Sequence, residues 1–174
     1  MENELVLIKP DRDMESRIAE YRLEFIANGD KVNGSHGLQH YEDIGQWLDL
    51  IAKMENEGNG IVDVPRTTYF SIFKDSGEIV GNIQLRHWID AELTAAGGHI
   101  GYSIRPSMRG KGYGKAQLML VLEKARKMGI GKVLLTCDKS NPASAGVIIA
   151  GGGVLEKEQI ADGVLEQFYW IEVK

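Results

Sequence analysis

The chain has 174 residues and a mass of 19.3 kDa, which is the size of one domain, and its 43% hydrophobic and 26% charged residues are typical of a folded globular protein. No apolar run approaches the roughly 20 residues that a membrane-spanning helix needs, so we expect no membrane partner. The single cysteine, Cys137, excludes an internal disulfide and a cysteine zinc cluster, which suits a reducing compartment. We therefore expect one cytoplasmic domain over residues 1–174, with no metal.

The net charge of -5 is unevenly distributed along the chain. Residues 1–87 carry 9 Lys and Arg against 16 Asp and Glu, a sum of -7, whereas residues 88–174 carry 11 against 9, a sum of +2. Nine basic residues lie between Arg105 and Lys139, in a segment that is either a solvated helix face or an anion site. The pI of about 5.4 and the acidic first half disfavour nucleic acid as a partner.

The first half of the chain shows both helical and strand periodicity. Apolar residues at Met14, Ile18, Tyr21 and Phe25 have helical spacing, and Asp43 is a suitable N-cap for a second helix that ends by Gly58. Turn residues separate two strand-like segments, which indicates a hairpin. The elements expected are a strand at 5–8, helices at 14–25 and 43–58, and strands at 69–73, 78–86 and 99–105.

The second half predicts two further helices and two further strands. A helix over 115–128 is followed by Gly129, and an apolar segment at 133–137 is typical of a buried strand. Asn141 followed by Pro142 is a helix start, and a last strand is expected over 164–173. This order of elements indicates a mixed α/β fold.

The segment that carries the most chemistry lies between the strand that ends near Arg105 and the helix that begins by Lys115. Glycine lacks a Cβ atom, so its backbone adopts positive φ angles and approaches a ligand closely. A helix N-terminus adds unpaired N–H groups and a partial positive charge. These features predict a phosphate cradle formed by Arg109, Gly110, Lys111, Gly112, Tyr113, Gly114 and Lys115.

Two common phosphate-binding templates do not fit this loop. The nucleotide P-loop needs a glycine at position 109 and Ser or Thr at position 116, where Arg109 and Ala116 stand. The dinucleotide fingerprint that begins at Gly110 needs a third glycine at position 115, which is Lys115.

The loop resembles the acyl-CoA loop of the Gcn5-related N-acetyltransferase (GNAT) family, whose signature is Arg or Gln, two residues, Gly, one residue, and Gly or Ala. Arg109, Gly112 and Gly114 match this signature, and the segments 99–106, 134–138 and 141–153 resemble the family's fourth strand, fifth strand and following helix. The resemblance implies an α/β fold with a mixed, mostly antiparallel central sheet flanked by helices and splayed between strands 4 and 5.

The resemblance also implies roles for individual residues. Backbone amides of residues 110–115 would hold the pyrophosphate of acetyl-CoA, and the amide near Ile104 would polarise the thioester carbonyl. Asn141 matches an asparagine that contacts the pantetheine arm, although an N-cap role explains it nearly as well. Ser144 lies one helical turn later and is a weaker candidate.

Acetyl transfer to an amine requires a base and an acid. His99 occupies the strand position where related enzymes often have Glu, so we expect it to be the base, with Glu92 as the second candidate. Many family members have a tyrosine that acts as the general acid seven residues after the asparagine that corresponds to Asn141. In this chain that position is Ile148. Tyr169, Tyr113 or a water molecule would then replace it, or the thiolate leaves unassisted.

The sequence therefore predicts an acetyl-CoA-dependent N-acetyltransferase that transfers the acetyl group directly to an amine of a small molecule, amino acid or peptide. The alternative is a non-catalytic acyl-CoA-binding or regulatory domain, because the usual tyrosine is missing. The acidic first half favours a cationic acceptor, and a homodimer is possible. His36 and His40 have a spacing that suits a metal, but no carboxylate motif completes such a site.

Overall fold

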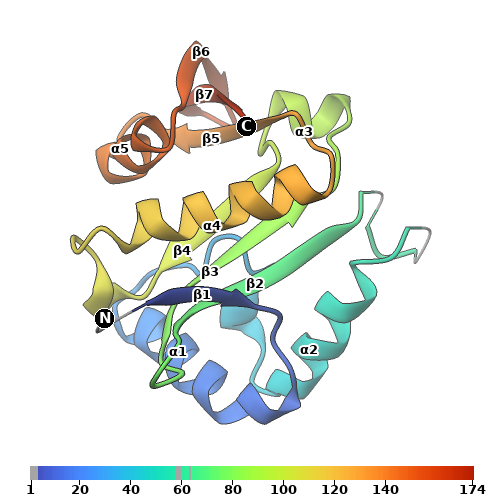
Figure 1. Ribbon diagram of the computed structural model, residues 1–174, viewed down its shortest axis with the longest axis vertical. Coiled ribbons are helices and arrows are strands. Elements are labelled where there is room, and N and C mark those ends of the chain that lie inside the picture. The colour runs from blue at the N-terminus through green and yellow to red at the C-terminus, as the bar shows by residue number, and fades with distance from the viewer. Residues whose placement is uncertain (1–3, 58–59, 63) are drawn as a thin grey trace.

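The computed structural model describes residues 4–57, 60–62 and 64–174, and its first four strands form an antiparallel sheet (Figure 1). Neighbouring strands of this sheet follow one another in the chain, in the order β1-β2-β3-β4. The strands are β1 (Leu5–Ile8), β2 (Arg66–Phe73), β3 (Ile79–Arg86) and β4 (Ile100–Ile104).

Helices cover both faces of this sheet (Figure 1). The helices α1 (Glu15–Ala27) and α2 (Ile44–Lys53) pack on one face, and α4 (Tyr113–Lys127) packs on the other. Successive side chains of a strand point to opposite faces. Tyr69 of β2 therefore joins the apolar cluster under α4, and Phe70 joins the cluster under α1 and α2.

A second antiparallel sheet contains the last three strands, in the order β5-β7-β6. They are β5 (Lys132–Asp138), β6 (Val154–Ala161) and β7 (Val164–Glu172), and α5 (Pro142–Ala150) connects β5 to β6. The sequence predicted β5, α5 and β7 but missed β6. This strand has almost no buried side chain, so it lacks the apolar alternation that identifies a strand.

The two sheets meet at a short junction between the start of β4 and the middle of β5. Gly98 forms an isolated bridge with Leu135, and the His99 N–H donates a 2.7 Å hydrogen bond to the Leu134 carbonyl. Beyond this junction β4 and β5 belong to different sheets. The predicted fold, a mostly antiparallel sheet splayed between its fourth and fifth strands, is confirmed.

Other differences from the sequence prediction are local. The connection over 87–98, between the strands expected at 78–86 and 99–105, contains a short helix that the sequence did not predict, α3 (Ala91–Ala95). The helix expected from Asp43 ends at Lys53, and Gly58, its predicted stop, lies outside the described residues. No helix in the described part of the chain combines the length and apolar character needed to cross a membrane.

The junction requires glycine at position 98. Its φ of +65° lies in the left-handed region, and a Cβ atom there would overlap the Leu134 carbonyl oxygen. We expect Gly98→Ala to lower the free energy of unfolding in urea by about 2 kcal/mol or more, from backbone strain and overpacking together. Gly29→Ala is the matched control, because Gly29 has a φ of +72° and open space around it. Equal losses of unfolding free energy in both variants would show that the close contact with Leu134 adds no cost beyond backbone strain.

Candidate active site

A cleft of about 1050 Å³ lies where β4 and β5 separate. One wall is β4, and the other is formed by β5 and α5. The segment 30–36 and the loop 108–115 border it as well. The separation of two strands leaves their facing backbone groups without strand partners, which is the usual reason for a ligand-binding crevice in such a sheet.

The glycine-containing loop reaches the cleft largely through its backbone. Gly110 and Gly112 have φ angles of +74° and +86°, and Gly112 is the N-cap of α4 without any side-chain cap. Gly114 is buried, and a Cβ atom there would lie 2.9 Å from the Val147 side chain of α5. Six of the seven predicted loop residues line the cleft; Lys111 does not, and its ammonium group donates to the Ser107 carbonyl at 3.0 Å.

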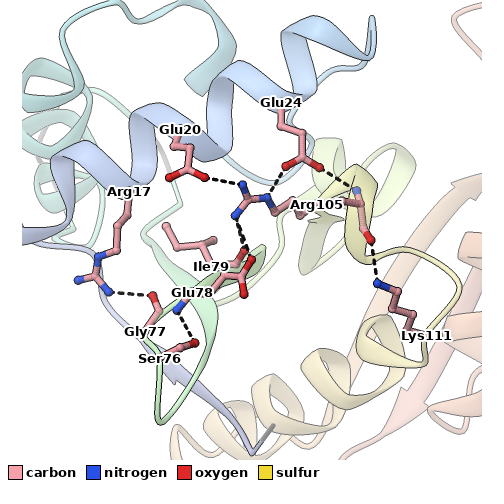
Figure 2. Close-up of polar contacts among 10 residues, drawn as sticks. Arg17, Glu20, Glu24, Ser76, Gly77, Glu78, Ile79, Arg105 and Lys111 are labelled. Atoms are coloured by element: carbon pink, nitrogen blue, oxygen red, sulfur yellow. Dashed lines mark hydrogen bonds and ion pairs between the residues drawn. The ribbon is translucent and has the colours of Figure 1, made fainter.

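Arg105, which the sequence placed in the basic segment, is held by carboxylates. Its buried guanidinium pairs with Glu24, with Glu20 at 3.0 Å and with Glu78 at 3.7 Å (Figure 2). Both Glu20 and Glu24 lie on α1, so this cluster joins α1 to the end of β4. Arg105 is therefore not part of an anion site.

Glu24 also fixes the start of the loop. Its second oxygen accepts a 2.7 Å hydrogen bond from the Ser107 N–H, while the first accepts from Arg105. Burial alone would raise the pKa of Glu24, but the hydrogen bonds from Arg105 and Ser107 outweigh it and lower the pKa below 4.5. Arg109 is anchored in a similar way, by an ion pair with Asp30 at 2.6 Å and by a hydrogen bond from its Nε to the Ile104 carbonyl.

Backbone pairing directs the Ile104 amide toward the cleft. The Arg105 N–H donates to Val80 of β3, and amide directions alternate along an antiparallel strand. The N–H and carbonyl of Ile104 therefore point away from β3. The hydrogen bond from Arg109 to the Ile104 carbonyl agrees with this direction.

The predicted residues of α5 also line the cleft. The Asn141 side chain caps α5 by accepting a 3.1 Å hydrogen bond from the Ser144 N–H. The Ser144 hydroxyl lies 2.9 Å from the Tyr102 hydroxyl, so a contact spans the cleft from α5 to β4. Ile148 is fully buried, so its position on α5 faces the core and not the cleft.

The three predicted catalytic residues do not line the cleft. His99 is 6% exposed, and its Nδ1 accepts a 3.0 Å hydrogen bond from the Leu134 N–H. Burial and the charge of Arg86 lower the pKa of His99 to about 4. Glu92 lies exposed on α3, and Tyr169 is buried with its hydroxyl donating to Gln167.

The cleft contains other ionisable residues that the sequence interpretation did not place there. His36, Arg66, Arg86 and Glu166 all line it. His36 has a φ of +53°, which is unusual for a residue with a side chain and is often found at functional sites. Partial burial and then the charges of Arg66 and Arg86 lower the pKa of His36 below 6.5. The two glycines that flank His36, Gly34 and Gly37, were the available sequence signal for this turn.

Comparisons with known proteins agree with this geometry. The model of the acetyltransferase (GNAT) family matches residues 34–148. No curated protein sequence matches significantly. Within the described residues, no group of three or more His, Cys, Asp or Glu side chains is arranged to hold a metal ion.

Solved structures share the fold at low sequence identity. A ribosomal-protein-S5-alanine acetyltransferase from Vibrio fischeri has a TM-score of 0.74 at 17% identity, covering 99% of this chain and 94% of that one. A GNAT-family acetyltransferase from Bacillus anthracis has a TM-score of 0.69 at 20% identity, with coverage of 99% and 96%. Spermidine N-acetyltransferase from Vibrio cholerae, solved with CoA and spermine, has a TM-score of 0.66 at 16% identity, with coverage of 97% and 95%.

The Glu24 contacts give a pH-dependent prediction. Because the pKa of folded Glu24 is depressed, its contribution to stability is complete above pH 4.5 and is lost as the pH falls through the folded pKa. We expect Glu24→Gln to lower the free energy of unfolding by about 1–3 kcal/mol at pH 7, from loss of charged hydrogen bonds. The difference from the parent should shrink below pH 4.

Glu20→Gln is the control for this measurement. Glu20 also pairs with Arg105, but its side chain is 72% exposed, so its ion pair contributes little. Urea unfolding at pH 7 and at pH 3.5 distinguishes the two variants. An equal, pH-independent loss in both would contradict the assigned role of Glu24.

Proposed function

This chain belongs to the acetyltransferase (GNAT) family, and we propose that it transfers the acetyl group of acetyl-CoA directly to an amine of a small molecule, amino acid or peptide. The observation that carries the proposal is the uncapped N-terminus of α4, with its glycine loop, at the border of the cleft between β4 and β5. We place this activity in one domain over residues 1–174.

The residues of the cleft fit the acetyl donor of the family. Gly110 and Gly112 leave open space beside the backbone, and the first turn of α4 offers N–H groups to a pyrophosphate. Asn141 and Ser144 line the opposite wall, where the pantetheine arm would run. The Ile104 amide, which points away from β3, would donate to the thioester carbonyl and stabilise the charge that develops there.

The geometry favours His36 over His99, Glu92 and Tyr169 as the base. Its depressed pKa keeps the imidazole of His36 neutral at pH 7, and it lines the cleft. It would take the proton from the acceptor ammonium group before attack on the thioester. The alternative function, a non-catalytic acyl-CoA-binding domain, would use the loop in the same way but would need no base.

Acetyl-CoA binding should depend on Gly112. An Asp at this position would place a carboxylate in the open space at the start of α4 and repel a pyrophosphate. We expect Gly112→Asp to weaken acetyl-CoA binding by more than about tenfold in calorimetry, which is about 1.4 kcal/mol. Gly129→Asp is the matched control, since Gly129 has a φ of +78° and open surroundings at the other end of α4. Unchanged affinity in Gly112→Asp would reject the proposed site.

The base assignment is tested by two matched substitutions. Both histidines are replaced by Asn, which has no titrating ring. At position 36, Asn tolerates the positive φ angle, and at position 99 its side-chain oxygen still accepts the hydrogen bond from the Leu134 N–H. We expect His36→Asn to lower kcat/KM by about 10²-fold with an amine that the parent acetylates. The acidic limb of the parent's pH profile should lie below pH 6.5 and should disappear in this variant.

His99→Asn should change kcat/KM by only a few-fold and keep the acidic limb. A large loss of rate in His99→Asn, together with a parent-like His36→Asn, would return the role of base to His99. Acetyl-CoA binding without transfer to any tested amine would favour the non-catalytic alternative.

A further inference from the structure

Two arginines stand directly opposite each other at the ends of β2 and β3. Arg66 and Arg86 are partners in the register of these antiparallel strands, so their side chains leave the sheet on the same face. Both line the cleft. Two guanidinium groups that lie side by side would both attract a ligand with negative charge.

The guanidinium group of Arg86 is incompletely satisfied. Its Nη1 donates to the carbonyls of Gly97 at 3.4 Å and Gly98 at 2.7 Å, whereas its Nε is buried without a hydrogen-bond partner. Among the described residues, no carboxylate lies within 4 Å of Arg86 to form an ion pair. Burial and the neighbouring charge of Arg66 lower the pKa of Arg86 to about 10. A mostly buried cation without a counter-charge is unusual unless something binds to it.

Arg86 also lies next to the place where the reaction would occur. Its backbone N–H donates to the His99 carbonyl at 2.8 Å, beside the junction where β4 and β5 separate. Gln84, two residues earlier on the same face, pairs with Gly101 of β4, and both line the cleft. Gly101 has no side chain, and this allows the turn that carries His36 to approach the strand closely.

The turn that carries His36 closes the other side of this space. Gly34 packs directly on Gly101, because a Cβ atom at Gly34 would overlap the Gly101 carbonyl. This contact brings the turn over β4. His36 is close enough to Arg66 and Arg86 for their charges to lower its pKa. An anion held by the arginines would therefore lie near the proposed base.

The charge of this region is opposite to that of the first half as a whole. Glu20, Glu24 and Glu78 are engaged by Arg105 at the other end of the sheet. Among the described residues, the carboxylates that line the cleft are Asp30, Asp138 and Glu166. Asp30 pairs with Arg109, whereas Asp138 and Glu166 are two like charges that face each other at the far end of β5. The negative charge of the described cleft residues thus lies away from Arg86, and an acceptor group bound beside Arg86 would be favoured by carrying negative charge.

We propose that Arg86 and Arg66 bind a carboxylate of the acceptor, so that the substrate is an amine that carries a carboxylate close to its amino group. Such a substrate is either a free amino acid or a peptide with an acidic residue near its N-terminus. A planar guanidinium group binds a carboxylate through two parallel hydrogen bonds, which would orient the acceptor as well as attract it. This inference rests on the acetyltransferase activity proposed above.

The test uses matched acceptors that differ in the carboxylate alone. Each free L-amino acid is compared with its carboxamide, and peptides with Asp or Glu at the second position are compared with the Asn or Gln peptides. We expect the parent to prefer the carboxylate member of at least one set by about tenfold or more in kcat/KM, mainly through KM. The set that shows the preference distinguishes an amino acid from a peptide.

Arg66→Gln and Arg86→Gln should reduce this preference toward one, and the preference is measured as the ratio of the two kcat/KM values within each variant, so that a general change in rate cancels. Arg86→Lys should restore part of the preference, because charge remains while the planar fork is lost. If Arg86→Gln fails to fold because its contacts to Gly97 and Gly98 are lost, the carboxylate preference is measured in Arg66→Gln instead. Arg126→Gln, an exposed residue on α4 outside this cleft, is the control.

Four outcomes would overturn the inference: equal rates for both members of every set, a preference for the uncharged members, a carboxylate preference that persists in both Gln variants, or transfer only to amines without a carboxylate. Acetyl-CoA binding without transfer to any amine is a different result, and so is loss of acetyl-CoA binding by the parent, because either would reject the proposed activity itself and the inference with it. Calorimetry with acetyl-CoA, together with the transfer assay on amines that lack a carboxylate, separates these cases.

Discussion

The short contact between Gly98–His99 and Leu134–Leu135 is the constraint on which the site depends. It joins the two sheets at one point and leaves the rest of β4 and β5 unpaired with each other. The imidazole of His99 strengthens the junction by accepting the Leu134 N–H. The residue that the sequence suggested as a base therefore holds together the point from which the cleft opens.

A second constraint sets the position of the loop 109–115, which we propose binds the pyrophosphate. Arg105 follows β4 directly, and its ion pairs with Glu20 and Glu24 tie this point to α1 (Figure 2). Glu24 then accepts a hydrogen bond from the Ser107 N–H, and the Arg109 side chain donates one to the Ile104 carbonyl. Charged side chains that resemble a binding patch in the sequence are thus used partly to fix the backbone, while backbone amides and the α4 N-terminus face the cleft.

The sequence predicted those features that depend on local pattern. Glycine spacing located the loop before α4, and the Asn141–Pro142 pair located the start of α5, because turn and cap chemistry are properties of neighbouring residues. The exposed strand β6 has no such pattern and was missed. The sequence did not place His36, Arg66 and Arg86 in the cleft, because strand register and the packing of Gly34 on Gly101 bring them together from distant parts of the chain.

The net charge of the first half and the local charges of the cleft lead to different expectations for the acceptor. A sum over half of the chain counts every carboxylate equally, but a ligand interacts mainly with the charges within a few ångströms in a cleft of low dielectric. Here Glu20, Glu24 and Glu78 are paired with Arg105, away from the arginine pair. The cross-strand register places Arg66 and Arg86 together at the part of the cleft next to the junction. In the proposed site, acceptor specificity therefore depends on which strand ends meet at the junction, and this arrangement is a property of the fold that a sum over the composition does not contain.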